Sequence, residues 1–257
     1  MGDGAGTGIG RRSVLGGALG AVTMVGLGLG GASPAAAANR GDLVAITYSG
    51  DVVKPREGSG VLGGAPNARL ASSLDANSFL EVTDSGNLYE HVWDPNRWRF
   101  DPYLRGWGFS AANTRLIAGL SYYRFLEIGT DGNLSLWSRR WSDDPWVEQV
   151  RGWGWGPDNT RLIAGITENT FLEVQANGDL SLWEWTGTGY SEFRLPGSGF
   201  TTANTRQVSG IGSPRTRWLS FYELTAESTL STWTYEGVAL VEESWPPIDV
   251  RNVRLMA

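Results

Sequence analysis

Tryptophan and phenylalanine recur in glycine-rich loops of this 257-residue chain, each loop ending at an asparagine. Residues 106–113 read GWGFSAAN, residues 152–159 read GWGWGPDN and residues 197–204 read GSGFTTAN. An aromatic face can pack against the C–H face of a sugar ring, while nearby amide and carboxylate groups bond the sugar hydroxyls. Glycine lets backbone and ligand approach closely. We therefore predict carbohydrate-binding residues in these loops: Trp107, Phe109, Asn113, Trp153, Trp155, Asp158, Asn159, Phe200 and Asn204.

A structural role is open for the same rings, because a large aromatic side chain can also fill the space between two packed elements. In the pairs Trp107/Phe109 and Trp153/Trp155, we expect one ring to point inward and the other outward, in either order. The two roles can then coexist within one loop.

Residue types that support catalysis are sparse. The chain has no cysteine and one histidine, His91, so thiol chemistry and histidine clusters are excluded. No nucleophile elbow, phosphate loop or calcium loop is present. A glycoside hydrolase needs only two carboxylates, but it needs one unique pair, whereas the acidic residues here recur along the chain. We expect no catalytic residue, metal site or cofactor.

The net charge of −6 argues against a nucleic-acid partner, whose phosphates would be repelled. Lys54 is the single lysine, and the arginines are dispersed apart from the pair Arg11-Arg12.

The chain is a repeat with a period of about 46 residues. An arginine followed by a run of small and branched residues returns at intervals of 45 to 48 residues. The five copies are Arg69, Arg115, Arg161, Arg206 and Arg254. A repeat of this length indicates a solenoid or a propeller.

Each repeat also contains a Phe-Leu-Glu-like segment (79–82, 125–128, 171–174, 221–224), a turn such as Asp131-Gly132, and a more polar segment. Asp-Gly and Asn-Gly between two β-rich runs predict hairpins. Four short antiparallel strands in a 46-residue unit predict one blade of a β-propeller. The small residues after each arginine favour an innermost strand, near the axis. We therefore predict an all-β, five-bladed propeller over residues 39–257.

The two ends of the chain are predicted to build the fifth blade together, with residues 253–257 as its innermost strand. The segment GDLVAI (41–46) resembles GDLSLW (178–183), so we assign it as the third strand of that blade. On this assignment the second strand falls on residues 34–40, which leaves open whether the blade has three strands or four.

Two further recurrences favour structural roles. Arg115 with Glu127, and Arg161 with Glu173, lie 12 residues apart on neighbouring strands, which suits a charge-assisted pair; a direct sugar contact is the alternative. We interpret four recurring tryptophans as core residues: Trp93, Trp137, Trp183 and Trp233.

Residues 1–38 have the features of an export signal. Arg11-Arg12 precedes a glycine-rich apolar stretch, and SPAAAA (33–38) offers a cleavage site. The arginine pair resembles a twin-arginine signal, which predicts secretion. A retained membrane anchor is the alternative. After cleavage we expect an extracellular monomer with no membrane association.

The five blades, their length and the Gly-Trp-Gly loops resemble tachylectin-2-like lectins. The resemblance implies a lectin for N-acetylated hexosamines with sites between adjacent blades. Since blades two to four keep the loop motif best, we expect about three competent sites, made multivalent by repetition. A protein-binding scaffold is the second hypothesis, and a glycan-cleaving enzyme with one axial site is the third.

Overall fold

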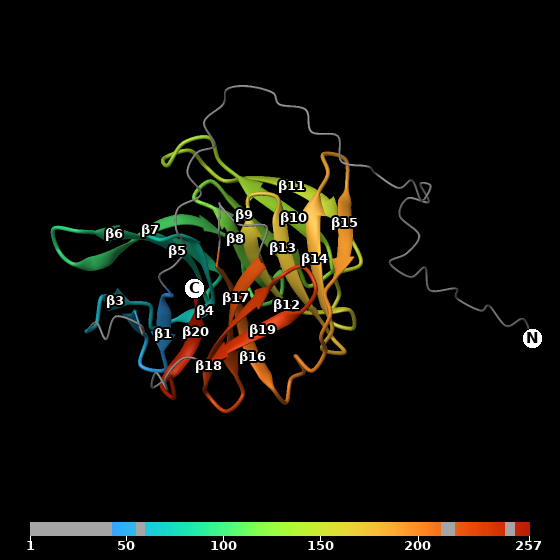
Figure 1. Ribbon diagram of the computed structural model, residues 1–257. Coiled ribbons are helices and arrows are strands. Elements are labelled where there is room, and N and C mark those ends of the chain that lie inside the picture. Colours follow the sequence, from blue (N-terminus) through green and yellow to red (C-terminus); the bar gives the residue numbers. More distant parts are fainter. Residues whose placement is uncertain (1–42, 55–59, 212–218, 245–249) are drawn as a thin grey trace, which may run out of the picture. The chain divides into compact units, whose positions relative to one another are not determined.

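The computed structural model describes residues 43–54, 60–211, 219–244 and 250–257. Every regular element within these ranges is a β-strand, and the strands form five four-stranded antiparallel sheets (Figure 1). The export signal predicted at residues 1–38 lies outside the described residues.

Four blades are continuous in the chain. Blade 1 contains β4 (Ala68–Asp75), β5 (Ser78–Thr83), β6 (Asn87–Asp94) and β7 (Arg99–Trp107). Blade 2 contains β8 (Thr114–Ser121), β9 (Arg124–Gly129), β10 (Leu134–Ser138) and β11 (Val147–Gly152). Blade 3 contains β12 (Thr160–Thr167), β13 (Thr170–Gln175), β14 (Leu180–Trp185) and β15 (Tyr190–Arg194). Blade 4 contains β16 (Thr205–Ile211), β17 (Leu219–Thr225), β18 (Leu230–Tyr235) and β19 (Leu240–Ser244).

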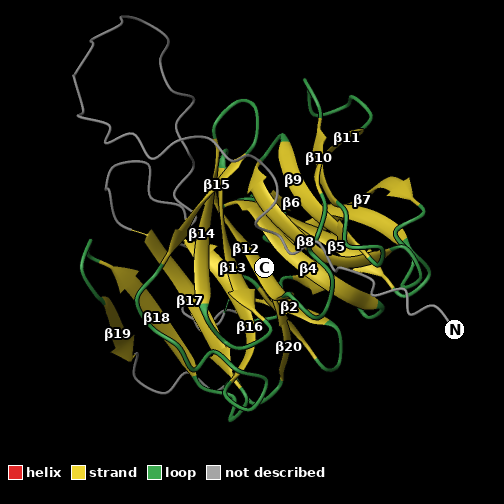
Figure 2. Ribbon diagram, turned by 90° about the vertical axis from the view of Figure 1, so that its right-hand side faces the viewer, coloured by secondary structure: helices red, strands yellow, loops and turns green. Residues whose placement is uncertain are grey.

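The closing blade joins the two ends of the described chain. Its strands lie in the order β20 (Val253–Met256), β1 (Ala45–Thr47), β2 (Asp51–Val53) and β3 (Gly63–Gly64). The inner strands β4, β8, β12, β16 and β20 contact one another in sequence, and β20 contacts β4 (Figure 2). The predicted all-β, five-bladed propeller and its closure by both ends are confirmed.

The strand assignment within the closing blade was wrong. Residues 45–47 pair directly with β20, so they form the second strand and not the third, and the blade has four strands. Gly50, with φ at +87°, closes the following turn as Gly86, with φ at +83°, does in blade 1. The likeness of GDLVAI to GDLSLW was misleading because the two segments share only a Gly-Asp-Leu start.

Blade faces pack against each other, which determines the burial of each strand. The second strand of blade 1, β5, is buried along its whole length. The outermost strand of blade 2, β11, is exposed at four consecutive positions. A strand covered on both faces thus buries even its polar residues, here Ser78, Glu81 and Thr83, while the polar fourth segments lie at the rim as predicted.

Small residues at the axis allow the inner strands to converge. A Cβ atom placed on Gly165 would lie 1.8 Å from the carbonyl oxygen of Gly119 in the preceding blade. A Cβ atom on Gly210 would lie 1.8 Å from the carbonyl oxygen of Gly165. No real side chain fits at such distances, so glycine is required where these backbones meet.

The recurring arginines join consecutive blades. Arg69 of blade 1 donates to the carbonyl oxygens of Phe109 (2.7 Å) and Thr114 (3.0 Å), at the entry to blade 2. Arg115 and Arg161 repeat this contact one blade further on, to Trp155 and Thr160 and to Phe200 and Thr205. Arg206 donates to the carbonyl oxygen of Val253, and Arg254 to those of Ala65 and Pro66, which completes the ring.

The predicted Arg–Glu pairing within a blade is therefore replaced by a different set of contacts. The guanidinium groups donate to backbone carbonyl oxygens of the next blade. The Glu127 carboxylate instead accepts hydrogen bonds from Thr114 (2.5 Å) and from Trp137 Nε1 (2.6 Å) in its own blade. Burial lowers the pKa of Arg69 and of Arg161, although nearby carboxylates oppose this shift.

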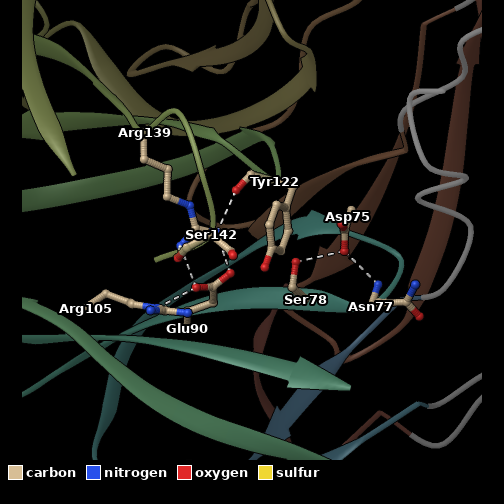
Figure 3. Close-up of polar contacts among 8 residues, drawn as sticks. All are labelled: Asp75, Asn77, Ser78, Glu90, Arg105, Tyr122, Arg139 and Ser142. Carbon is tan, nitrogen blue, oxygen red and sulfur yellow. Dashed lines mark hydrogen bonds and ion pairs between the residues drawn. The ribbon is translucent and has the colours of Figure 1, made fainter. Parts of the chain in front are cut away.

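A buried charged group adds a second connection between blades 1 and 2 (Figure 3). Glu90 on β6 is fully buried and accepts two hydrogen bonds from Arg139, at 2.6 and 2.8 Å, and one from Arg105 at 2.7 Å. Arg139 also donates to the carbonyl oxygens of Tyr122 and Ser142. This charge-assisted network fixes the two blades that flank the hollow described below.

We predict that Gly165→Ala destabilises the protein by about 3 kcal/mol, because the added methyl group overlaps backbone that cannot move without displacing a blade. The matched control is Gly156→Ala, at a position where no atom lies within 4 Å of the added Cβ. Denaturant unfolding measures both. Equal stability of the two variants would contradict the close approach at the axis.

Glu90→Gln is expected to cost about 3 kcal/mol or more, because it leaves the buried guanidinium of Arg139 uncompensated. Arg99→Gln removes an exposed ion pair with Asp101 and should cost less than about 1 kcal/mol. Thermal and urea unfolding of both variants give the comparison. A stable Glu90→Gln protein would show that the network does not join the blades.

Candidate functional site

The three aromatic loops, at 106–109, 152–155 and 197–200, connect consecutive blades, and we call each a lip. Trp107 and Trp153 are 81% and 69% exposed, whereas Phe109, Trp155 and Phe200 are only 4–5% exposed. The intervening glycines Gly108 and Gly154 have φ at +97° and +92°, which turns successive side chains to opposite sides. The first ring of each pair therefore points outward and the second inward.

The inward rings are wedges between blades. Phe109 lies 5.1 Å from the ring of Trp137 and 6.2 Å from that of Phe125. Trp155 packs in the same way on Trp183 (4.7 Å), and Phe200 on Trp233 (5.1 Å). Because these three rings are buried, their faces are occupied by protein, and only the outward rings offer a free face at the surface.

The lip asparagines hold the loops in shape. Asn113 Nδ2 donates to the carbonyl oxygen of Gly108 at 2.9 Å. Asn159 and Asn204 donate to Gly154 and Gly199 at 3.0 and 2.8 Å. The side-chain amide that sequence reasoning assigned to sugar recognition is therefore used for the loop itself. Asp158 is exposed in the turn after the second lip.

A hollow of about 520 Å³ lies between the first lip and blade 2. It brings together Trp107, Phe109 and Asn113 from the predicted set with side chains of β9, β10 and β11. The other predicted residues lie at the second lip (Trp153, Trp155, Asp158, Asn159) and at the third (Phe200, Asn204). The hollow falls within the roughly 300–1,000 Å³ typical of small-molecule sites.

Three carboxylates line the hollow; Glu127 was considered from the sequence as an alternative sugar contact, whereas Asp131 and Glu148 were missed as site residues. Glu127 and Trp137 belong to the lining, together with Asp131 in the β9–β10 turn and Glu148 on β11. Burial raises the pKa of Glu127, as do the nearby charges of Glu148 and Asp131, while its hydrogen bonds from Thr114 and Trp137 lower it. The signal was present in the sequence, but it lay in the strands and the β9–β10 turn of blade 2 and not in the lip.

A serine–glutamate pair recurs beside the tryptophan in blades 2, 3 and 4. Ser135 donates to Glu148 at 2.7 Å, Ser181 to Glu192 at 2.8 Å and Ser231 to Glu242 at 2.7 Å. Each glutamate lies opposite the tryptophan of the neighbouring strand. The three blades predicted to keep a common motif therefore share a polar arrangement that extends beyond the lips.

Blade 1 carries His91 where the other three carry tryptophan. Strand register places Phe125 opposite Trp137, and Phe79 opposite His91. The His91 ring stacks on Phe79 at 4.4 Å, and its Nε2 lies 2.6 Å from Glu81. Grouping Trp93 with the recurring tryptophans was therefore wrong, although Trp93 does pack against the core. Counting twelve residues from each Phe-Leu-Glu phenylalanine identifies the correct set.

The part of the chain that the structure describes contains no group of three or more acidic or histidine side chains placed to hold a metal ion. A search of the same residues for a helix with the length and hydropathy of a membrane span also found none.

No protein-family model and no curated protein matches the chain. Among solved structures, it is similar to the N-terminal domain of Nup159 (8% identity, TM-score 0.45), with 83% of this chain and 62% of that chain covered. It is also similar to Prp20p from Saccharomyces cerevisiae, with 13% identity and a TM-score of 0.40; the match covers 76% of this chain and 56% of that chain. A third similar structure is that of PorZ of Porphyromonas gingivalis, a surface component of a secretion system. The identity is 14% and the TM-score 0.44, and the match covers 81% of this chain and 31% of that chain. The chain spans less than two thirds of each of these chains, and similarity this low says nothing about function.

We predict opposite effects for the two tryptophans of the second lip. Trp155→Ala should lower stability by about 3–5 kcal/mol, because it removes a buried ring from between two blades. Trp153→Ala should change the stability by less than about 0.5 kcal/mol, because that ring is exposed. Differential scanning calorimetry of both variants measures the contrast. Similar melting temperatures for the two variants would refute the assignment of wedge and outward ring.

Proposed function

We propose that this chain is a carbohydrate-binding protein whose site is the hollow between blades 1 and 2. The observation that supports this most is the combination of a largely exposed tryptophan, Trp107, with a polar hollow that it borders. A free indole face suits the C–H face of a sugar, while Asn133, Ser135 and Glu148 offer partners for hydroxyl groups.

The place of the hollow, between adjacent blades, agrees with what the resemblance to tachylectin-2-like lectins implies. The recurrence of Trp153 at the second lip provides a second free ring. Weak contacts at two lips would strengthen each other on a surface that displays many copies of one glycan. A secreted lectin for surface polysaccharides remains our proposal, with N-acetylated hexosamines among the first ligands to examine.

Binding suits this site better than catalysis. Both oxygens of Glu127 already accept hydrogen bonds from Thr114 and Trp137, which fix the carboxylate within its own blade. Glu148 accepts a hydrogen bond from Ser135. We therefore propose no glycoside cleavage, and release of reducing sugar from a bound polysaccharide would overturn this part of the proposal.

Glycan-array screening followed by calorimetric titration tests the proposal. Trp107→Ala should weaken the sugar affinity at least about tenfold, a loss of roughly 1.4 kcal/mol. The matched control is Trp141→Ala, which removes another exposed tryptophan that does not line the hollow, and it should bind normally. If the folded protein binds no sugar at millimolar sugar concentration, the lectin proposal is contradicted and a protein-binding scaffold is favoured.

A further inference from the structure

Blades 2 and 3 differ at two positions beside the serine–glutamate pair. Strand register places Gly129 of blade 2 where blade 3 has Gln175, since each pairs with the threonine that starts the inner strand. It also places Val150 where blade 3 has Arg194, since each lies opposite the serine of the serine–glutamate pair.

In blade 3 these two side chains cover the serine–glutamate pair. Gln175 Nε2 donates to Ser181 Oγ at 2.9 Å and to Glu192 Oε1 at 3.4 Å. Arg194 Nε lies 3.5 Å from the same Glu192 oxygen. The carboxylate of blade 3 therefore has an amide and a guanidinium from its own blade beside it.

In blade 2 the amide and the cation are both absent from these positions. Gly129 has no side chain, and Val150 is apolar and 58% exposed. Both residues line the hollow, and Asp131 Oδ1 lies 2.5 Å from the position that a Cβ atom on Gly129 would take. The equivalent glutamate, Glu148, keeps its serine but has no guanidinium at the position of Arg194.

The charged residues that line the hollow are all acidic. Its thirteen lining residues include Glu127, Asp131 and Glu148, and no lysine, arginine or histidine is among them. Arg69 is the cation that acts on Glu127 from outside this lining, and its guanidinium donates to two backbone carbonyl oxygens. Three carboxylates thus line one volume that has no cation in its lining.

The three carboxylates already accept hydrogen bonds from neighbouring protein groups. Both oxygens of Glu127 accept bonds from protein groups, as do both oxygens of Asp131, from Asn133. Glu148 uses one oxygen for Ser135. A neutral hydroxyl can still bond the remaining lone pairs, but only a cation also gains from all three negative charges at this range.

We propose that the hollow selects a sugar bearing a protonated amine, an unacetylated hexosamine unit of a cationic polysaccharide. This inference rests on the proposed carbohydrate binding and names its ligand class. The ammonium group takes the place that Arg194 holds in blade 3, beside Glu148, and the ring lies against Trp107. The volume of about 520 Å³ accommodates a ring and not merely one side-chain amine. Blade 3, with its own cation, lacks this selectivity.

Calorimetric titration of the full chain with glucosamine trimer and with N-acetylglucosamine trimer tests the proposal. We expect the glucosamine trimer to bind at least about tenfold more tightly. Val150→Arg should supply the missing cation and abolish this preference. Val147→Arg is the matched control, because it adds the same charge to an exposed position of the same strand outside the hollow, and it should leave the preference intact.

The outcomes separate the two proposals. If the acetylated trimer binds as well or better, and Val150→Arg has no more effect than Val147→Arg, then the charge inference is overturned while carbohydrate binding stands. If neither trimer binds and no glycan is retained on the array, the proposed function itself fails. If trilysine competes fully with the glucosamine trimer at equal concentration, the site recognises any amine and the assignment to a sugar is overturned.

Discussion

The arginine at the start of each inner strand is the contact on which the rest of the structure depends. Arg69 donates hydrogen bonds to the carbonyl oxygen of the lip wedge Phe109 and to that of Thr114, the first residue of the next inner strand. One guanidinium therefore sets the spacing of two blades and the shape of the loop between them. Because the contact is to backbone, the lip side chains can vary between blades without loosening the ring. Trp107 and Ser198 occupy equivalent lip positions for this reason.

The sequence was sufficient for the architecture because repetition constrains it strongly. Five arginines at nearly equal spacing, Asp-Gly turns and a small-residue strand agree on a propeller, and closure follows from where the copies begin and end. The closing blade was assigned one strand out of place, since Gly-Asp-Leu at 41–43 imitates a different strand of the repeat. Pairing partners, which sequence does not contain, resolve this: Ala45 lies opposite Met256.

The first lip borders a hollow, but the residues that line this hollow were only partly predictable from the sequence. The lips stand out because aromatic residues between glycines are conspicuous, yet three of the five rings are buried wedges, and the asparagines bond the loop backbone. What gives the hollow its chemistry is the substitution of Gln175 and Arg194 by Gly129 and Val150. Such a difference is visible only after strand register aligns two blades residue by residue. Blades that resemble one another by motif are thereby expected to differ in ligand.

The most direct measurement is a crystal structure of the chain grown with glucosamine trimer. The account predicts density for a sugar ring against the indole of Trp107, with its amine nitrogen about 2.8 Å from a Glu148 oxygen. A trimer bound at the propeller axis, or on an outer strand away from the first lip, would contradict it. So would an empty hollow in a crystal whose protein binds the trimer in solution.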